Sequence, residues 1–68
     1  MSTAEQVVTF RARNAGATSL AFRIVNTETG EMMWIPKSQI LEPKDPFAEV
    51  NEEEITIPIW LAKQKGLV

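Results

Sequence analysis

The chain has 68 residues, enough for one domain and too few for two. It contains neither Cys nor His, which excludes disulfides, thiolate nucleophiles and the usual zinc and transition-metal sites. Its net charge of −2 argues against a dedicated duplex-DNA-binding domain, because such domains are normally basic. We therefore expect one small domain over residues 1–68, held together by apolar packing, with residues 1–5 flexible.

Two strands separated by a turn are predicted for the first part of the chain. Residues 7–13 alternate between apolar side chains such as Phe10 and polar ones, which is the period of a half-buried strand. Residues 14–19 are small and polar, which indicates a turn. Residues 20–25 form the second predicted strand. Its apolar side chains, expected to share one face, are Leu20, Phe22 and Ile24.

A hairpin is the clearest local signal that follows. Residues 26–31 lie between two apolar runs, and Gly30 suits the left-handed position that closes a type I turn with a bulge. The third strand is expected at residues 32–35, and Pro36 ends it or places it at an edge because proline cannot donate to a ladder.

The register of this hairpin follows from where the turn is centred. A turn centred on residues 28–30 places Ile24 near Trp34 and Val25 near Met33. Both faces of the hairpin are then partly apolar, as in a sheet that curls on itself.

The connection to the next strand is predicted to be irregular. Residues 37–41 suit either a short 3₁₀ turn or a continuation of the strand, and two prolines make residues 42–46 a loop. Residues 47–51 are compatible with a short strand. A clearer strand is predicted at residues 53–57, where apolar and polar side chains alternate.

The chain ends in a predicted short helix with a signal at each end. Pro58 suits the first helical position, and the lysines of residues 59–65 lie in the last turn, where the helix dipole favours cations. Gly66 is placed as a left-handed cap, with Leu67 folding back over the helix. The predicted fold is mainly β: a small open barrel, SH3-like or OB-like, of four to five antiparallel strands with a short C-terminal helix.

The inventory of side chains argues against an enzyme. Without His, Cys or Tyr, catalysis falls to Glu, Asp, Lys, Ser or Thr, and the carboxylates gather in residues 42–54, which read as a solvated loop. The isolated glycines form no phosphate-binding loop. No signal peptide and no membrane-spanning apolar run are visible. We expect a soluble, intracellular protein without catalytic residues, metal or cofactor.

Basic side chains at alternate strand positions form the first candidate surface; they are Arg11, Arg13 and Arg23, with Lys37 nearby. Such a face, with rings such as Trp34, is typical of single-stranded nucleic-acid binding. The simpler interpretation, which we favour, is that Phe10 and Phe22 are core and that the arginines only keep the outer face soluble.

The two tryptophans offer further candidate surfaces. Trp34 belongs to the core unless Met33 and Ile35 face inward, in which case Trp34 faces out as an aromatic anchor for a partner. Trp60 on the terminal helix is interpreted mainly as structural, with homodimerisation as the alternative. The acidic residues 42–54 are either a solvated loop or a mimic of nucleic-acid charge towards a basic protein.

Residues 31–40 and 57–67 carry a resemblance to short phage and prophage proteins without an established activity. The shared patterns are a hairpin ending in Trp-Ile-Pro-Lys-Ser-Gln-Ile, here residues 34–40, and a tail Pro-x-Trp-Leu-Ala-x-x-Lys-Gly-Leu, here residues 58–67. The resemblance implies a phage or mobile-element origin and the cytoplasm of a bacterial host. It also implies roles such as replication accessory, nucleic-acid binding or interference with a host defence protein.

Taken together, these observations predict a non-catalytic binding module whose partner is a protein. Single-stranded nucleic acid, bound through the arginine face and Trp34, is the alternative partner. A homodimeric structural protein joined through Trp60 is the third hypothesis. No membrane partner is expected.

Overall fold

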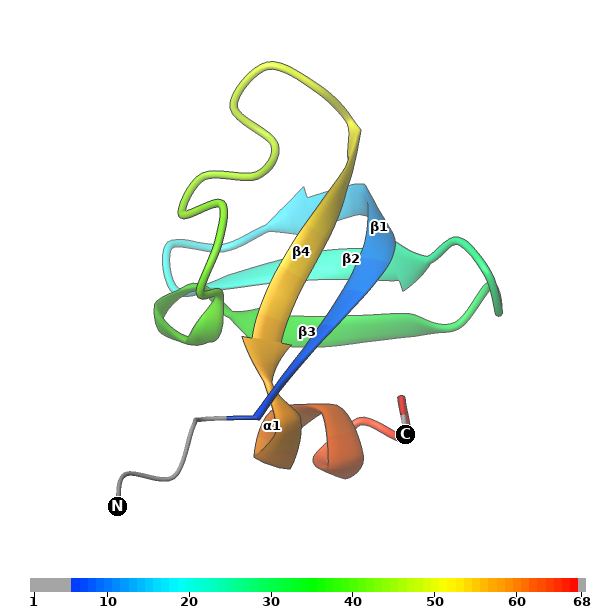
Figure 1. The fold of residues 1–68 in the computed structure, drawn as a ribbon. Coiled ribbons are helices and arrows are strands. Elements are labelled where there is room, and N and C mark those ends of the chain that lie inside the picture. Colours follow the sequence, from blue (N-terminus) through cyan, green and yellow to red (C-terminus); the bar gives the residue numbers. More distant parts are fainter. Residues whose placement is uncertain (1–5, 68) are drawn as a thin grey trace.

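A computed structural model of the chain describes residues 6–67. Its elements, shown in Figure 1, are strands β1 (Val7–Ala17), β2 (Ala21–Asn26), β3 (Met32–Pro36) and β4 (Glu52–Pro58), the 3₁₀ helix η1 (Lys37–Gln39) and the helix α1 (Ile59–Gln64). The expectation of flexibility for residues 1–5 lies outside the described residues.

The strands form one antiparallel sheet in the order β3-β2-β1-β4. In Figure 1 β1 and β4 cross diagonally over β2 and β3, so the sheet curls round its own inner face, and α1 follows directly from the end of β4. The expected fold class, a mainly β open barrel-like sheet with a short C-terminal helix, is confirmed. The described residues contain four strands, the lower of the two numbers expected.

The core fills the inner face of this curled sheet. Alternate residues of every strand point inward, and Leu61 and Ala62 of α1 join them. The five largest fully buried side chains are all isoleucines: Ile24, Ile35, Ile40, Ile55 and Ile57. Leu20 departs from the prediction, because it precedes β2 in the turn and its side chain is 78% exposed.

The hairpin between β2 and β3 forms where the sequence predicts it, but its register differs by one residue. Ile24 pairs with Met33, Val25 with Met32 and Arg23 with Trp34. The Asn26 carbonyl accepts the N–H of Gly30, and the Asn26 N–H donates to Glu31 O at 2.8 Å. The loop therefore has four residues, one more than a turn centred on 28–30 requires, and Trp34 lies opposite Arg23 instead of Ile24.

The short strand considered for residues 47–51 is absent; this segment is a series of turns and bends. Phe47 instead packs edge-on against Phe22, with ring centroids 5.3 Å apart. The position beside β4 is taken by Leu41 and Glu42, whose backbones bond Thr56 at 2.8 and 2.9 Å. Phe47 thus packs against the core from a loop and not from a strand.

The end of α1 has the predicted cap. Gly66 has a φ of +78°, the Leu67 N–H donates to Ala62 O at 2.8 Å, and the Gly66 N–H donates to Lys63 O at 3.2 Å. This pair of bonds is the Schellman arrangement, and it turns Leu67 back against the core. Within residues 6–67, α1 is far too short to span a bilayer, and no other helix is long and apolar enough.

Candidate functional site

The outer face of the sheet has two chemically different halves. On β1 and β4 it is polar and internally paired: the hydroxyls of Thr9 and Thr56 lie 2.7 Å apart, and arginines of β1 face glutamates of β4. On β2 and β3 it is apolar. Met33 and Ile35 are buried, so the side chains between them point out, and Met32 is 55% and Trp34 45% exposed.

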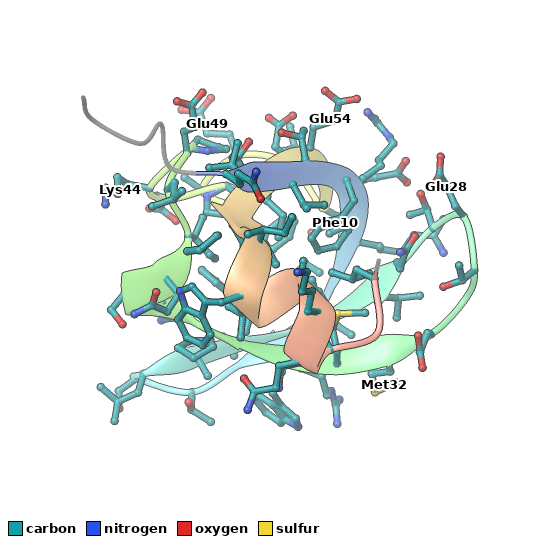
Figure 2. The ribbon with its side chains drawn as sticks, turned by 60° about the horizontal axis from the view of Figure 1, so that its bottom comes forward. Phe10, Glu28, Met32, Lys44, Glu49 and Glu54 are labelled. Atoms are coloured by element: carbon teal, nitrogen blue, oxygen red, sulfur yellow. The ribbon has the colours of Figure 1, made fainter. Side chains whose placement is uncertain are left out.

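We call the residues of this apolar half the outer patch: Arg23 and Val25 of β2 with Met32 and Trp34 of β3. The pairing register places Arg23 directly opposite Trp34 and Val25 directly opposite Met32. Side chains opposite one another in adjacent strands touch on the same face. Met32 is seen in Figure 2 pointing away from the ribbon, on the side of the molecule opposite Glu49 and Glu54.

Arg23 is held in the outer patch by two hydrogen bonds to the backbone. Its Nε and Nη2 donate to the Ala15 carbonyl at 3.0 and 2.9 Å, and its guanidinium carbon lies 5.8 Å from the centre of the Trp34 ring. A guanidinium has five N–H donors, so this contact uses two of them and leaves others directed to solvent. The patch therefore combines a large apolar surface with one fixed positive charge.

Arg11 and Arg13, the other predicted arginines, lie on the polar half and are engaged by one glutamate. Arg11 Nε donates to Glu52, and Arg13 Nη2 lies 3.5 Å from the same carboxylate. The hydrogen bond from Arg11 is the main cause that lowers the pKa of Glu52, and the same bond raises the pKa of Arg11. All three arginines lie on the outer face, but Arg11 and Arg13 pair with a carboxylate, whereas Arg23 lies over the Trp34 ring.

Lys37 lies at the end of β3 in η1, and its ammonium group is 4.8 Å from the centre of the Phe22 ring. Phe22 is buried, as expected of a core ring. This cation–π contact covers the rim of the core at the η1 end. Lys37 is half-buried and is not part of the outer patch.

Trp60 is the other exposed tryptophan, at 54%, whereas the neighbouring Leu61 is buried. Trp60 therefore contributes little to the core, and the mainly structural interpretation of this side chain is not supported by its burial. It lies on α1, separate from the strands that carry the outer patch.

The acidic segment forms a shallow hollow instead of a closed site. It has a volume of about 230 Å³ and is lined by prolines and carboxylates, including Pro43, Pro46, Asp45, Glu49 and Glu53. Among residues 6–67, no three carboxylates approach one another closely enough to hold a metal ion.

Sequence reasoning named Arg23 and Trp34 but missed their partners Met32 and Val25. Residues 32–35 are all apolar, so periodicity alone does not say which of them face outward. The deciding information lies in the pairing with β2, where Phe22 and Ile24 are buried together. The observed register, with its four-residue loop, places Ile35 and Met33 opposite them on that same face, whereas the predicted register would have placed Trp34 there. Comparisons of this chain with family models, with curated proteins and with solved structures find no significant match.

Proposed function

We propose that this protein is a non-catalytic binding module that holds a protein partner through the outer patch. The observation that carries the proposal is the exposure of Trp34 on strand β3, beside Met32 and under the guanidinium of Arg23. Aromatic side chains and arginines are the residues that most often supply the binding energy of protein interfaces. A monomer gains no stability from exposing Met32 and Trp34 side by side.

The chemistry of the outer patch defines the partner. Trp34 and Met32 require an apolar depression, and the remaining donors of Arg23 require a carboxylate at its rim. The partner is therefore a protein with an apolar pocket flanked by Asp or Glu. Following the resemblance of the Trp34 and Trp60 segments to phage proteins, we place the partner in the cytoplasm of a bacterial host.

Single-stranded nucleic acid is less well supported as the ligand. Arg11 and Arg13 already share the Glu52 carboxylate, and Glu53 and Glu54 follow on the same strand. A phosphate approaching β1 meets this negative charge, which weakens the electrostatic term that dominates nucleic-acid binding. Arg23 alone remains beside an exposed ring on the outer face.

The proposal is tested by affinity capture from a bacterial lysate with three versions of the protein: the natural chain, Trp34→Ala and Trp60→Ala. Both substitutions remove an exposed indole, so Trp60→Ala is a matched control. We expect at least one protein to be captured by the natural chain and by Trp60→Ala, and to be lost with Trp34→Ala. Loss of a tight contact at a buried aromatic anchor typically weakens binding by about 2 kcal/mol or more.

A labelled single-stranded oligonucleotide, titrated at low and at moderate salt, separates the two ligand classes. We expect no binding tighter than about 10 μM. Tight binding that falls steeply with salt and is lost on joint substitution of Arg11 and Arg13 by Ala overturns the proposal in favour of nucleic acid. Capture that depends on Trp60 and not on Trp34 overturns it in favour of the helix surface.

A further inference from the structure

The outer edge of β3 has free backbone groups. The two odd-numbered residues that flank β3 bond towards β2. The Asn26 N–H donates to the Glu31 carbonyl, and the Lys37 N–H donates to the Leu20 carbonyl, at 2.8 Å each. Backbone groups alternate in direction along an antiparallel strand. The N–H and carbonyl groups of Met32 and Trp34 and the carbonyl of Pro36 therefore point away from β2. Within residues 6–67, β3 pairs with β2 alone, and no other backbone group bonds this edge.

The opposite edge of the sheet is protected, which makes the β3 edge distinctive. On β4, Thr56 is bonded on its open side by Leu41 and Glu42. The rest of that edge carries Glu52, Glu53 and Glu54, and charges on an edge strand oppose pairing with another chain. The β3 edge has no charged residue between Glu31 and Lys37.

The charges that flank β3 are complementary when a second copy of the strand runs antiparallel to the first. Glu31 and Lys37 lie at equal distances in sequence on either side of Trp34. If two β3 strands pair antiparallel with Trp34 opposite Trp34, Glu31, which directly precedes β3, comes opposite Lys37 of the other copy. Lys37 is the first residue of η1, and its N–H still bonds the Leu20 carbonyl of β3's neighbouring segment. Opposite charges in directly facing positions stabilise a strand pair, and this register contains two such pairs.

We infer that β3 is the interface through which two copies of this chain pair edge to edge into one continuous sheet. In the register centred on Trp34, each Trp34 N–H donates to the Trp34 carbonyl of the second copy. Each Met32 N–H donates to the Pro36 carbonyl of the second copy. Pro36 loses no donor here, because only its carbonyl is required.

This pairing has a consequence for the outer patch. The side chains of Met32 and Trp34 keep their outward direction, so the two patches meet across the two-fold axis with the Trp34 rings adjacent. The dimer presents one aromatic surface flanked by two Arg23 guanidinium groups. The inference goes beyond the proposed function and does not rest on it, since it concerns the backbone edge of β3 and the charges at its ends.

The test is sedimentation equilibrium of the full chain from about 10 μM to 1 mM, with charge variants at the two ends of β3. We expect the natural chain to approach twice its mass of 7.6 kDa. Glu31→Lys sets like charges opposite each other at both ends of the interface and raises the dimer dissociation constant about tenfold. Glu28→Lys makes the same charge change in the turn and leaves that constant unchanged.

The double variant, Glu31→Lys with Lys37→Glu, restores opposite charges only in this register, and we expect it to recover dimerisation. Circular dichroism confirms that each variant is folded. Hydrogen exchange gives a second readout: the amides of Met32 and Trp34 exchange rapidly in the monomer and are protected in the dimer. A natural chain that stays monomeric at 1 mM overturns the inference. So does a dimer that Glu31→Lys leaves intact and Trp60→Ala abolishes.

Discussion

Glu52 shows how one exposed side chain determines what a basic strand can do. Glu52 accepts a hydrogen bond from Arg11, and its carboxylate lies 3.5 Å from Arg13 Nη2. The positive charge of β1 is therefore balanced by a carboxylate on the neighbouring strand β4. The pair is exposed on both sides, which limits its contribution to stability and makes it sensitive to salt. Its consequence for the proposed function is larger, because Arg11 and Arg13 are paired with Glu52 while Arg23 lies beside the exposed ring of Trp34.

The lowered pKa of Glu52 gives a pH-dependent prediction. Because its pKa in the folded state lies below the ordinary value of 4.5, the bond with Arg11 stabilises the fold above that pH and is lost as pH falls through the lowered pKa. We expect NMR titration to give a low pKa for Glu52 in the natural chain. In Arg11→Gln that pKa moves up towards its ordinary value. An unchanged pKa in the variant contradicts the assignment of Arg11 as the main cause.

Gly30 is the residue on which the β2–β3 hairpin depends. Its φ is +78°, and a Cβ at this position meets nothing within 4 Å. A substitution there is penalised by backbone conformation alone and not by a clash. We expect Gly30→Ala to lower the free energy of unfolding by about 1–2 kcal/mol in urea denaturation. The smaller cost of Gly30→Asn is the control, since Asn tolerates this conformation better; equal stability of both variants and the natural chain contradicts the turn geometry.

At the scale of elements, alternation and capping signals predicted most of the fold. The period of two found β2 and β4, and the Pro58 and Gly66 signals found α1, each to within a residue at its ends. For β1 it found only residues 7–13. Residues 14–17, predicted as part of a turn, continue the strand past an irregularity between Asn14 and Gly16. Register was less predictable. The length of the hairpin loop depends on Asn26. Its side chain accepts the Glu28 N–H at 2.9 Å, and its carbonyl accepts the Gly30 N–H. The composition of the loop does not reveal those bonds.

The outer patch was only partly predictable for the same reason. Trp34 was named as a candidate, but its outward direction depends on Met33 and Ile35 being buried together, which requires the pairing with β2. The neutralisation of Arg11 and Arg13 depends on the pairing of β1 with β4, strands far apart in the sequence. Long-range pairing of this kind leaves no local pattern to read.

The end of α1 permits a prediction about the helix as a unit. Leu67 folds back through its bond to Ala62 and packs against the core. We expect Leu67→Ala to lower the free energy of unfolding by about 1–2 kcal/mol, since it removes partly buried apolar surface. Lys63→Ala, on the exposed side of the same helix, should change it by less than about 0.5 kcal/mol. Equal effects of the two substitutions, measured by urea denaturation, contradict the packing of Leu67.

At the scale of the whole molecule, the acidic side and the outer patch lie on different sides. Glu49 and Glu54 project from one side and Met32 from the opposite one in Figure 2. The carboxylates of the acidic side oppose the approach of a phosphate backbone, and under the proposed function the outer patch on β2 and β3 is the surface that contacts the partner.

The most direct test of the proposed function follows the two tryptophans separately. Trp34 and Trp60 are the only tryptophans of the chain, so Trp60→Phe leaves Trp34 as the sole indole, and Trp34→Phe leaves Trp60. Each variant is titrated with the captured partner while its tryptophan emission is recorded, with the emission of the partner alone subtracted. We predict a shift to shorter wavelength for Trp60→Phe, because binding buries Trp34, and no shift for Trp34→Phe. A shift confined to Trp34→Phe contradicts the outer patch as the binding surface.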